Sequence, residues 1–274
     1  MRAFAHVSLV LVLACAPLAL SANPELGWRI AELTRRIAIA PEDATLYLRR
    51  GELRRSGHEL EAARADLDEA RRLAPGMPGL ELAYARLWLD AGRPERAAGP
   101  LDALLAREPQ HVQALVLRGR ARAALGDPLA GAEDLSAALR YSARPTPELY
   151  LERAALLQSR GDAQLGAALA GLDEGVARLG PAYVLVRAAL ELEVERERYA
   201  GALARFEALP EAVRQRPAWQ ARRGDWLVAL GREAEADEAY RAARAALHAD
   251  DARRRSSAEA ADLERRIAAA LATR

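Results

Sequence analysis

The feature that most constrains this chain is a set of small residues that returns about every 34 residues. A period of this length indicates that one supersecondary unit is repeated, and that each copy buries its apolar faces by stacking on its neighbours. A second set, of glycines, follows the small residues at a nearly constant distance. The small residues are Gly51, Ala85, Gly119, Ala154, Ala188 and Gly224, and the glycines are Gly92, Gly126, Gly161 and Gly231, with Gly57 one place early in the first repeat.

A third recurring pattern, of a small, a large and a small residue, follows the glycines. Small residues at a helix crossing let two backbones approach closely, and the large residue fills the space beside them. Glycine between two helices supplies the left-handed conformation that ends the first of them. We therefore predict a hairpin of two helices in each repeat. The pattern reads Ala63/Leu67/Ala70, Ala97/Leu101/Leu104 and Ala236/Tyr240/Ala243, and the fourth and fifth repeats have Ala168/Leu172/Gly175 and Ala202/Phe206/Leu209 about two residues late.

Helix-entry residues follow the glycines. Asp127 and Pro128 have the residue types of an N-cap and a first helical position, Pro94 that of a first helical position, and Asp162 that of a cap. Pro100 falls inside the predicted second helix of the second repeat, where proline cannot donate its backbone hydrogen bond. The sequence therefore predicts a kink or a late helix start at this place.

In these motifs the chain resembles the tetratricopeptide repeat (TPR) family over nearly all of residues 42–247. The resemblance implies an all-α fold, a right-handed α-α superhelix (TPR solenoid) of about six helical hairpins. Such a stack needs a cap at each end. Residues 23–41 are the expected N-terminal capping helix, with Ile30, Leu33, Ile37 and Ile39 as its apolar set.

Residues 248–274 are the expected linker and C-terminal capping helix. Ser256 and Glu259 have the spacing of a capping box at its start. Leu263, Ile267 and Leu271 form one apolar stripe, as a helix that packs on a core requires.

Residues 1–22 have the pattern of a bacterial export signal. Arg2 precedes an apolar run from Val7 to Ala14, and small residues before Ala22 or Asn23 suit a signal peptidase. The mature protein is then periplasmic.

Cys15 leaves a second possibility open. Residues 12–15 resemble a lipobox, in which the cysteine is lipidated and holds the protein on an envelope membrane, whereas the apolar stretch after Cys15 favours an ordinary cut near Ala22. A lipid at Cys15 is the only membrane contact that we expect.

The composition argues against nucleic-acid binding, since 40 basic residues, all arginine, balance 39 acidic ones. His58, His111 and His248 fall at separate turns or boundaries and do not converge on a metal. No phosphate-binding glycine loop and no Gly-x-Ser-x-Gly occurs. We expect no catalytic residues, no metal, no cofactor and no enzymatic activity.

A row of arginines stands one residue before the small residue of the first helix. Asp66 lies 16 residues after Arg50, and Asp134 lies 16 residues after Arg118. These positions oppose one another in a hairpin, so we predict Arg–Asp pairs within the repeats rather than a ligand-binding ladder. The other members of the row are Arg153, Arg187 and Arg223.

In TPR proteins the first helices line a concave groove, and the resemblance carries that groove onto three rails of this sequence. Arg86 and Arg120 make its first half charged, and the later half is apolar. We expect a peptide or helix with an acidic group over these arginines and an apolar face beyond them. The alternative is that the aliphatic rail only packs one first helix on the next. The groove residues are Leu48, Glu52, Arg55, Leu82, Arg86, Leu89, Val116, Arg120, Leu151, Gln158, Leu185 and Leu192.

The sequence therefore indicates a protein-binding scaffold of the bacterial cell envelope. The alternative is a non-catalytic subunit that recognises the substrate of an envelope enzyme system. Neither the protein or peptide partner nor the oligomeric state follows from the sequence.

Overall fold

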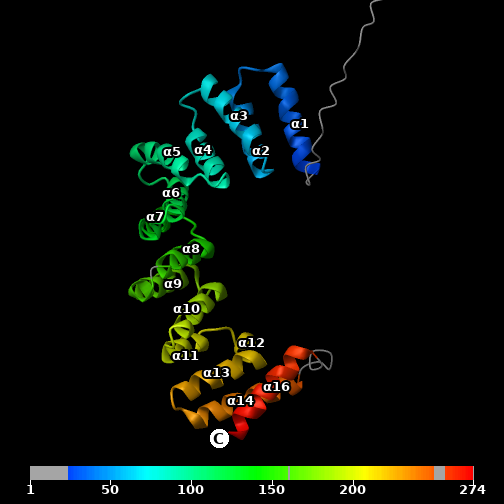
Figure 1. Ribbon diagram of the computed structural model, residues 1–274, viewed down its shortest axis with the longest axis vertical. Coiled ribbons are helices and arrows are strands. Elements are labelled where there is room, and N and C mark those ends of the chain that lie inside the picture. The colour runs from blue at the N-terminus through cyan, green and yellow to red at the C-terminus, as the bar shows by residue number, and fades with distance from the viewer. Residues whose placement is uncertain (1–23, 160, 250–256, 274) are drawn as a thin grey trace, which may run out of the picture. The chain divides into compact units, whose positions relative to one another are not determined.

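The computed structural model describes residues 24–159, 161–249 and 257–273, which form α-helices joined by short turns (Figure 1). The predicted export signal, Cys15 and Ser256 lie outside these residues. The chain divides into two compact units, Met1–Arg93 and Pro94–Arg274. The boundary falls inside the second predicted repeat, between its two helices.

Unit 1 contains α1 (Pro24–Ile39), α2 (Ala44–Ser56), α3 (Leu60–Leu73) and α4 (Leu80–Asp90). Unit 2 contains α5 (Pro94–Arg107), α6 (Val112–Ala124), α7 (Pro128–Tyr141), α8 (Pro147–Gln158), the 3-10 turn η1 (Asp162–Gln164), α9 (Leu165–Leu179), α10 (Tyr183–Glu195), α11 (Tyr199–Glu207), α12 (Glu211–Arg214), α13 (Pro217–Ala229), α14 (Glu233–Ala249) and α16 (Ala258–Ala272).

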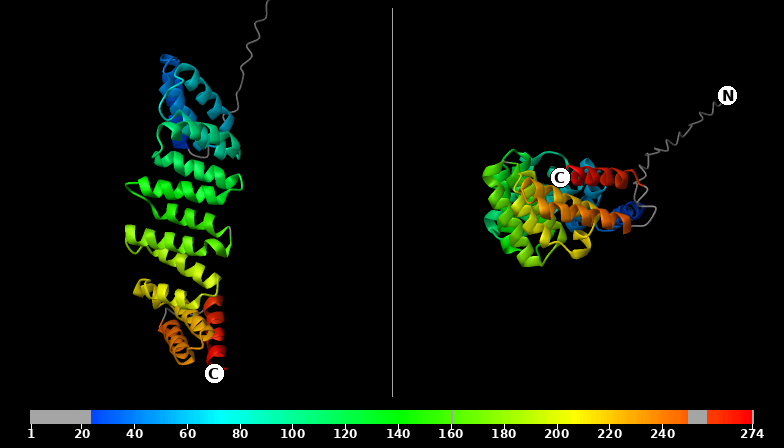
Figure 2. Two further views of the ribbon diagram at one scale, coloured as in Figure 1. Left: turned by 90° about the vertical axis from the view of Figure 1, so that its left-hand side faces the viewer. Right: turned by 90° about the horizontal axis from the view of Figure 1, so that it is seen from below.

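The helices pair as the repeat predicts. In unit 1 α2 packs on α3, and in unit 2 α6 packs on α7, α8 on α9, α10 on α11 and α13 on α14, so that successive hairpins of unit 2 lie side by side in layers (Figure 2). The prediction of an all-α fold built from helical hairpins is confirmed.

One left-handed residue separates the two helices of every repeat. Gly92, Gly126, Gly161 and Gly231 have φ angles of +65° to +91°. In the first and fifth repeats, however, the left-handed residues are His58 at φ 60° and Glu197 at φ 57°. Gly57, which the sequence suggested for the first turn, has a φ of −87°. Two side chains therefore occupy a conformation that favours glycine.

The predicted helix starts agree only in part. Asp127 caps α7 by accepting a hydrogen bond from the Ala130 N–H at 3.1 Å, and Pro94 begins α5. The late start that Pro100 suggested is wrong, because α5 continues through this proline. The prediction of Asp162 as the helix cap is also wrong, because η1 comes first and α9 begins at Leu165. This extra turn explains why the pattern of the fourth repeat comes late.

Small residues bring the helices of a hairpin together. A Cβ on Gly119 of α6 would lie 2.9 Å from the Gly131 carbonyl oxygen, and one on Gly131 of α7 would lie 2.7 Å from the Gly119 oxygen. The two backbones therefore touch at this crossing, and no larger residue fits without a shift. Leu135 is fully buried beside them.

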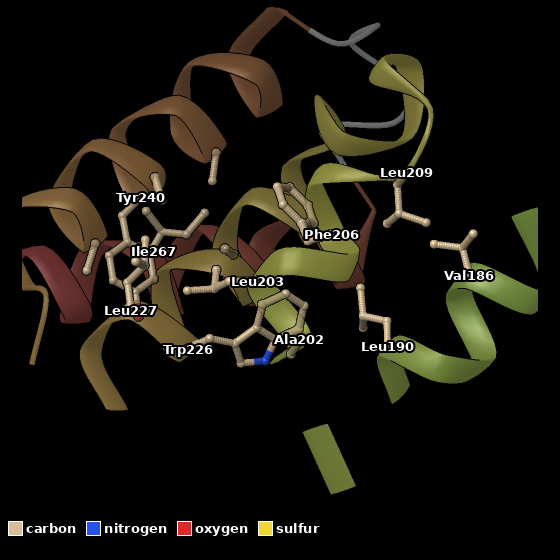
Figure 3. Close-up of a cluster of buried hydrophobic side chains, with 14 residues drawn as sticks. Val186, Leu190, Ala202, Leu203, Phe206, Leu209, Trp226, Leu227, Tyr240 and Ile267 are labelled. Carbon is tan, nitrogen blue, oxygen red and sulfur yellow. The ribbon is translucent and has the colours of Figure 1, made fainter. Parts of the chain in front are cut away.

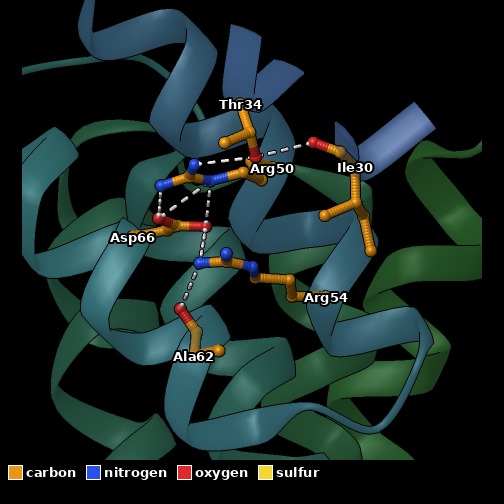
Figure 4. A network of polar contacts seen from close by, with 6 residues as sticks. All are labelled: Ile30, Thr34, Arg50, Arg54, Ala62 and Asp66. Carbon is orange, nitrogen blue, oxygen red and sulfur yellow. Dashed lines mark hydrogen bonds and ion pairs between the residues drawn. The ribbon is translucent and has the colours of Figure 1, made fainter. Parts of the chain in front are cut away.

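Arg–Asp pairs lie inside two hairpins, as predicted (Figure 4). Asp66 of α3 accepts hydrogen bonds from Arg50 Nε at 3.0 Å, Arg50 Nη2 at 2.6 Å and Arg54 Nη1 at 2.9 Å. Asp134 of α7 accepts from Arg118 Nε at 3.0 Å and Nη2 at 2.8 Å. Both aspartates are almost fully buried. The pairing therefore explains these two arginines.

The later arginines of the row differ. Arg153 is buried, but Nη2 donates to the Gly171 carbonyl oxygen at 3.0 Å and to Glu174 at 2.9 Å. Arg223 lies 3.9 Å from Glu207, at the limit of an ion pair. Both residues pair with glutamate rather than with aspartate.

Helices at both ends of the described chain cover apolar faces. Ile267 of α16 is fully buried in the cluster of Figure 3, and Leu263 and Leu271 pack against the same cluster, as predicted. The N-cap of α16 is Ser257, whose hydroxyl accepts from the Ala260 N–H at 3.1 Å.

At the N-terminal end, α1 buries Leu33 and Ile37. Ile39 does not join them, because it ends the helix and is 84% exposed. Its assignment to the apolar set was wrong.

Candidate partner-binding site

Unit 1 contains an open hollow of about 600 Å³ between α1, α2 and α4, which we call the unit 1 hollow. It is lined by Trp28, Arg29, Glu32, Leu33, Leu48, Arg49, Glu52, Leu53, Gly79 and Arg86. Leu48, Glu52 and Arg86 are residues of the predicted groove, so the sequence identified part of this surface.

Two helices present the same residue types to the hollow. Residues 28–33 of α1 read Trp-Arg-Ile-Ala-Glu-Leu, and residues 48–53 of α2 read Leu-Arg-Arg-Gly-Glu-Leu. In each segment positions 1, 2, 5 and 6 line the hollow. This is one face of a helix, since residues four apart lie above one another. Each helix therefore contributes two apolar side chains, one arginine and one glutamate.

The apolar part of the hollow includes an aromatic side chain that faces solvent. Trp28 is 64% exposed, whereas Leu33 is buried and Leu48 and Leu53 are half-buried. Burying an exposed tryptophan contributes a large apolar area, and tryptophan is enriched where proteins bind one another. The hollow is thus suited to take up apolar side chains.

The charges of the hollow are unevenly paired. Glu32 pairs with Arg35, and Glu52 pairs with Arg55 at 3.1 Å and with Arg86 at 3.3 Å. Arg29 and Arg49 are exposed, and neither makes an ion pair with any residue that the structure describes. Both carboxylates are therefore neutralised while two guanidinium groups are not, and the hollow favours a negatively charged ligand.

The other predicted groove residues of unit 1 lie outside the hollow. Arg55 bridges Glu52 and Asp90, and so ties α2 to α4. Leu89 is half-buried, and Leu82 is buried. The burial of Leu82 agrees with the alternative hypothesis, in which the aliphatic groove residues pack one first helix on the next and bind no partner.

The predicted groove residues of unit 2 show the same division. Arg120 donates from Nε and Nη2 to Glu152, each at 2.8 Å, and these hydrogen bonds raise the pKa of the guanidinium above its ordinary value. Leu185 and Leu192 are buried in the core, so packing accounts for these two leucines. Val116, Leu151 and Gln158 are half-buried.

No group of three or more His, Cys, Asp or Glu residues lies close enough to hold a metal ion in the part of the chain that the structure describes. Within the same residues, no helix has the length and apolar character that a membrane span needs.

Sequence reasoning missed Trp28, Arg29, Arg49 and Leu53. The resemblance places the groove on residues 42–247, from the first repeat onward, and therefore makes α1 a cap without a binding role. The signal that identifies these residues is the recurrence of the hexapeptide pattern apolar-Arg-x-x-Glu-Leu, 20 positions apart, in α1 and α2.

No protein-family model matches this chain. Two curated proteins match a segment of 108 residues: the FK506-binding protein-like proteins of Mus musculus, at 40% identity, and of Rattus norvegicus, at 38%. The segment covers 37% of this chain and 30% of each rodent protein, so the chain spans less than a third of their length.

Solved structures resemble the chain over most of its length. The C-terminal part of a TPR repeat-containing protein from Cytophaga hutchinsonii has a TM-score of 0.66 at 13% identity, over 87% of this chain and 94% of that one. A tetratricopeptide repeat protein from Parabacteroides merdae has a TM-score of 0.53 at 16% identity, over 90% and 93%. PilW, a type IV pilus biogenesis factor, has a TM-score of 0.50 at 17% identity, over 80% and 97%. These likenesses show that the chain has a tetratricopeptide-type, all-helical fold.

Proposed function

We propose that this chain is a non-catalytic protein-binding scaffold of the bacterial cell envelope, and that the unit 1 hollow is where a segment of its partner binds. The observation that carries the proposal is the exposed Trp28 beside an open hollow with apolar walls and two arginines that make no ion pair with a described residue. A concave site with apolar walls and a few polar groups is the usual form of a binding site.

The expected affinity can be bounded from Trp28. A tryptophan buries up to about 250 Å² in a protein core, so covering its 64% exposed part removes roughly 150 Å² from water. At about 25 cal/mol/Å² this contributes roughly 4 kcal/mol. One anchor of this size supports only a weak complex after the entropy of association is subtracted. We therefore expect the partner to contact further surfaces of the chain.

The export-signal pattern of residues 1–22, with an apolar run after Arg2, supports the envelope location. We propose an ordinary signal-peptidase cut near Ala22, which leaves a periplasmic protein. Fractionation of cells that express the wild type and Cys15→Ser tests this. Both proteins should be released with the periplasm. Membrane retention of the wild type alone would instead show a lipoprotein anchored through Cys15.

Photo-crosslinking tests the scaffold proposal. The chain contains no lysine, so amine-reactive crosslinkers have no side chain to attack. A photo-reactive amino acid in place of Leu48 reports on the hollow, and one in place of Glu61, whose side chain is 86% exposed on α3, is the control. We expect the Leu48 position to capture a protein in envelope extracts and the Glu61 position not to capture it. Capture at neither position, or equal capture at both, would contradict a binding site in the hollow.

The alternative, a subunit that recognises the substrate of an envelope enzyme system, uses the same binding surface. The two functions differ in what is captured. A hydrolase or transferase that co-purifies with the chain in stoichiometric amount would favour this alternative, whereas a structural or assembly protein favours the scaffold.

A further inference from the structure

The first described helix occupies the register of a second helix of a repeat. Three hydrogen bonds run from a first helix back to a residue 16 positions earlier: Arg50 to Thr34 at 3.0 Å, Tyr84 to Asp68 at 2.6 Å and Arg118 to Asp102 at 3.1 Å. The accepting aspartates lie on α3 and α5, which are second helices. Thr34 takes the same place on α1. Helix α1 is thus the second helix of a repeat that precedes the first one.

The face of α1 that would cross a first helix lines the hollow. Arg29 and Leu33 correspond, 34 positions later, to Ala63 and Leu67 of α3. Both of these are buried, and a Cβ on Gly51 of α2 would lie 3.0 Å from Leu67 Cδ2. In the first complete hairpin these positions are therefore covered by the first helix α2. In α1 the same positions face the hollow.

Helix α2 shows the same difference. Arg49 and Leu53 correspond to Ala83 and Leu87 of α4, each of which is 1% exposed. In α2, by contrast, Arg49 is exposed and Leu53 is half-buried, and both line the hollow. Arg29, Arg49 and Leu53 are thus more exposed than their counterparts one repeat later, which lie in a cluster that Tyr47 and Leu48 of the first helix α2 pack against. Leu33 is already buried.

We propose that an amphipathic, acidic helix of a partner protein docks in the unit 1 hollow and takes the place of the first helix of the repeat to which α1 belongs. Its apolar face would cover Trp28 and Leu53, with side chains spaced three and four residues apart. Its carboxylates would pair with Arg29 and Arg49, whose guanidinium groups have no ion-pair partner among the described residues. This inference rests on the proposed function and specifies the kind of partner segment that the hollow accepts.

The length of the helix follows from the repeat. Helix α2 has 13 residues, and a helix that replaces a first helix needs the same length. A suitable probe is a fluorescein-labelled peptide of 13 residues, the length of α2. It has leucine at the positions that correspond to the buried residues of α2, two glutamates beside this apolar face, and helix-favouring residues elsewhere. A second peptide has lysine in place of the two glutamates. The affinity of each peptide for the full chain is measured by fluorescence anisotropy titration.

Charge reversal provides the test. We expect the acidic peptide to bind the wild type at least tenfold more tightly than the lysine peptide. Arg29→Glu, Arg49→Glu should reverse that preference. The matched control is Arg187→Glu, Arg244→Glu, which changes two exposed arginines of unit 2 that make no ion pair among the described residues. This control should bind both peptides as the wild type does.

Three results would overturn the inference. The first is a preference that both double variants change equally, because the effect is then one of net charge. The second is the absence of saturable binding, which would make Arg29 and Arg49 a polar end of the stack. The third is a photo-crosslink from the Leu48 position to residues 1–23 of the same chain, to a second copy or to anionic lipid vesicles instead of the peptide.

The scaffold proposal can survive such a failure. If the peptide does not bind but the Leu48 position still captures an envelope protein, the hollow binds a segment of another kind. If neither occurs, both proposals fail.

Discussion

The buried carboxylate of Asp66 should contribute more to the stability of unit 1 than any exposed ion pair of that unit. Its side chain is 4% exposed, and it faces Arg50 and Arg54, whose side chains are 12% and 21% exposed. Arg50 in turn donates to Thr34, so the carboxylate also orients one hydrogen bond between α1 and α2, beside the apolar contacts of Leu33 and Ile37 with Leu46 (Figure 4). Asp66→Ala would leave two partly buried guanidinium groups without a carboxylate partner.

The size of the loss can be worked out from these contacts. Removing one partner of a buried pair costs about 3–5 kcal/mol. Water can reach both arginines in part, so we expect the lower end, about 3 kcal/mol. The described part of unit 1, residues 24–93, has the size of a small domain. For a domain of about 60–100 residues, a loss of about 3 kcal/mol lowers the melting temperature by roughly 12 °C or more. An exposed pair on the same helix, Glu61 with Arg64 at 3.9 Å, should contribute less than about 0.5 kcal/mol.

Hydrogen–deuterium exchange over residues 44–73, at increasing urea, measures this for α2 and α3 separately from unit 2. The variants are Asp66→Ala, Arg50→Ala, their combination, and Glu61→Ala as the control. We expect a coupling energy between Arg50 and Asp66 of at least about 1 kcal/mol, because the two groups are in direct contact. If Asp66→Ala loses no more stability than Glu61→Ala, the carboxylate is not supporting the hairpin and the reasoning is refuted.

Three further substitutions test the backbone and core. His58→Gly should raise the free energy of unfolding by up to about 1 kcal/mol, because glycine relieves a left-handed φ of 60°; a lower melting temperature would contradict this. Tyr150→Phe should leave stability unchanged or raise it by about 1 kcal/mol, since the buried Tyr150 hydroxyl has no hydrogen-bond partner within the described part of the chain, and a clear loss in urea unfolding would reveal one. Gly131→Ala should lose about 1–3 kcal/mol, because its Cβ meets the Gly119 carbonyl oxygen at 2.7 Å; thermal melting at the wild-type temperature would show that α7 can move away.

Much of the fold could be predicted from the sequence because it depends on local rules that repeat. The small residues, the turn glycines and the opposed Arg50 and Asp66 all follow from a 34-residue period, and each is found where that period places it. The errors arise where the period is broken. An extra turn delays α9 in the fourth repeat, and the left-handed position falls on His58 rather than on Gly57.

The candidate site was harder to predict, because the repeat pattern shows neither which side chains are buried nor which charges are paired. A groove residue such as Leu185 has the same type and spacing whether it binds a partner or fills a core, and only its burial separates the two. The sequence shows no carboxylate partner for Arg86 or Arg120, because each partner lies more than 30 positions away. In the structure Arg86 pairs with Glu52 and Arg120 pairs with Glu152, each on a neighbouring first helix. Conversely, Arg29 precedes the repeats that the sequence motifs identify, and its place in the hollow follows from the packing of α1 on α2.

The ion pairs between successive first helices have a mechanical consequence. Arg55 with Asp90 joins α2 to α4, Arg120 with Glu152 joins α6 to α8, and Arg222 with Glu191 joins α10 to α13. These side chains are long, partly solvated, and joined by bonds that rotate, so they tolerate a change in helix spacing that a close-packed crossing would not. Where first helices also share buried side chains, as α8 and α10 do around Leu185 and Leu192, that packing sets their spacing, and the ion pairs add a contribution that falls as salt screens them. Raising the salt concentration therefore weakens the polar contacts between first helices while the apolar contacts beneath them keep their strength.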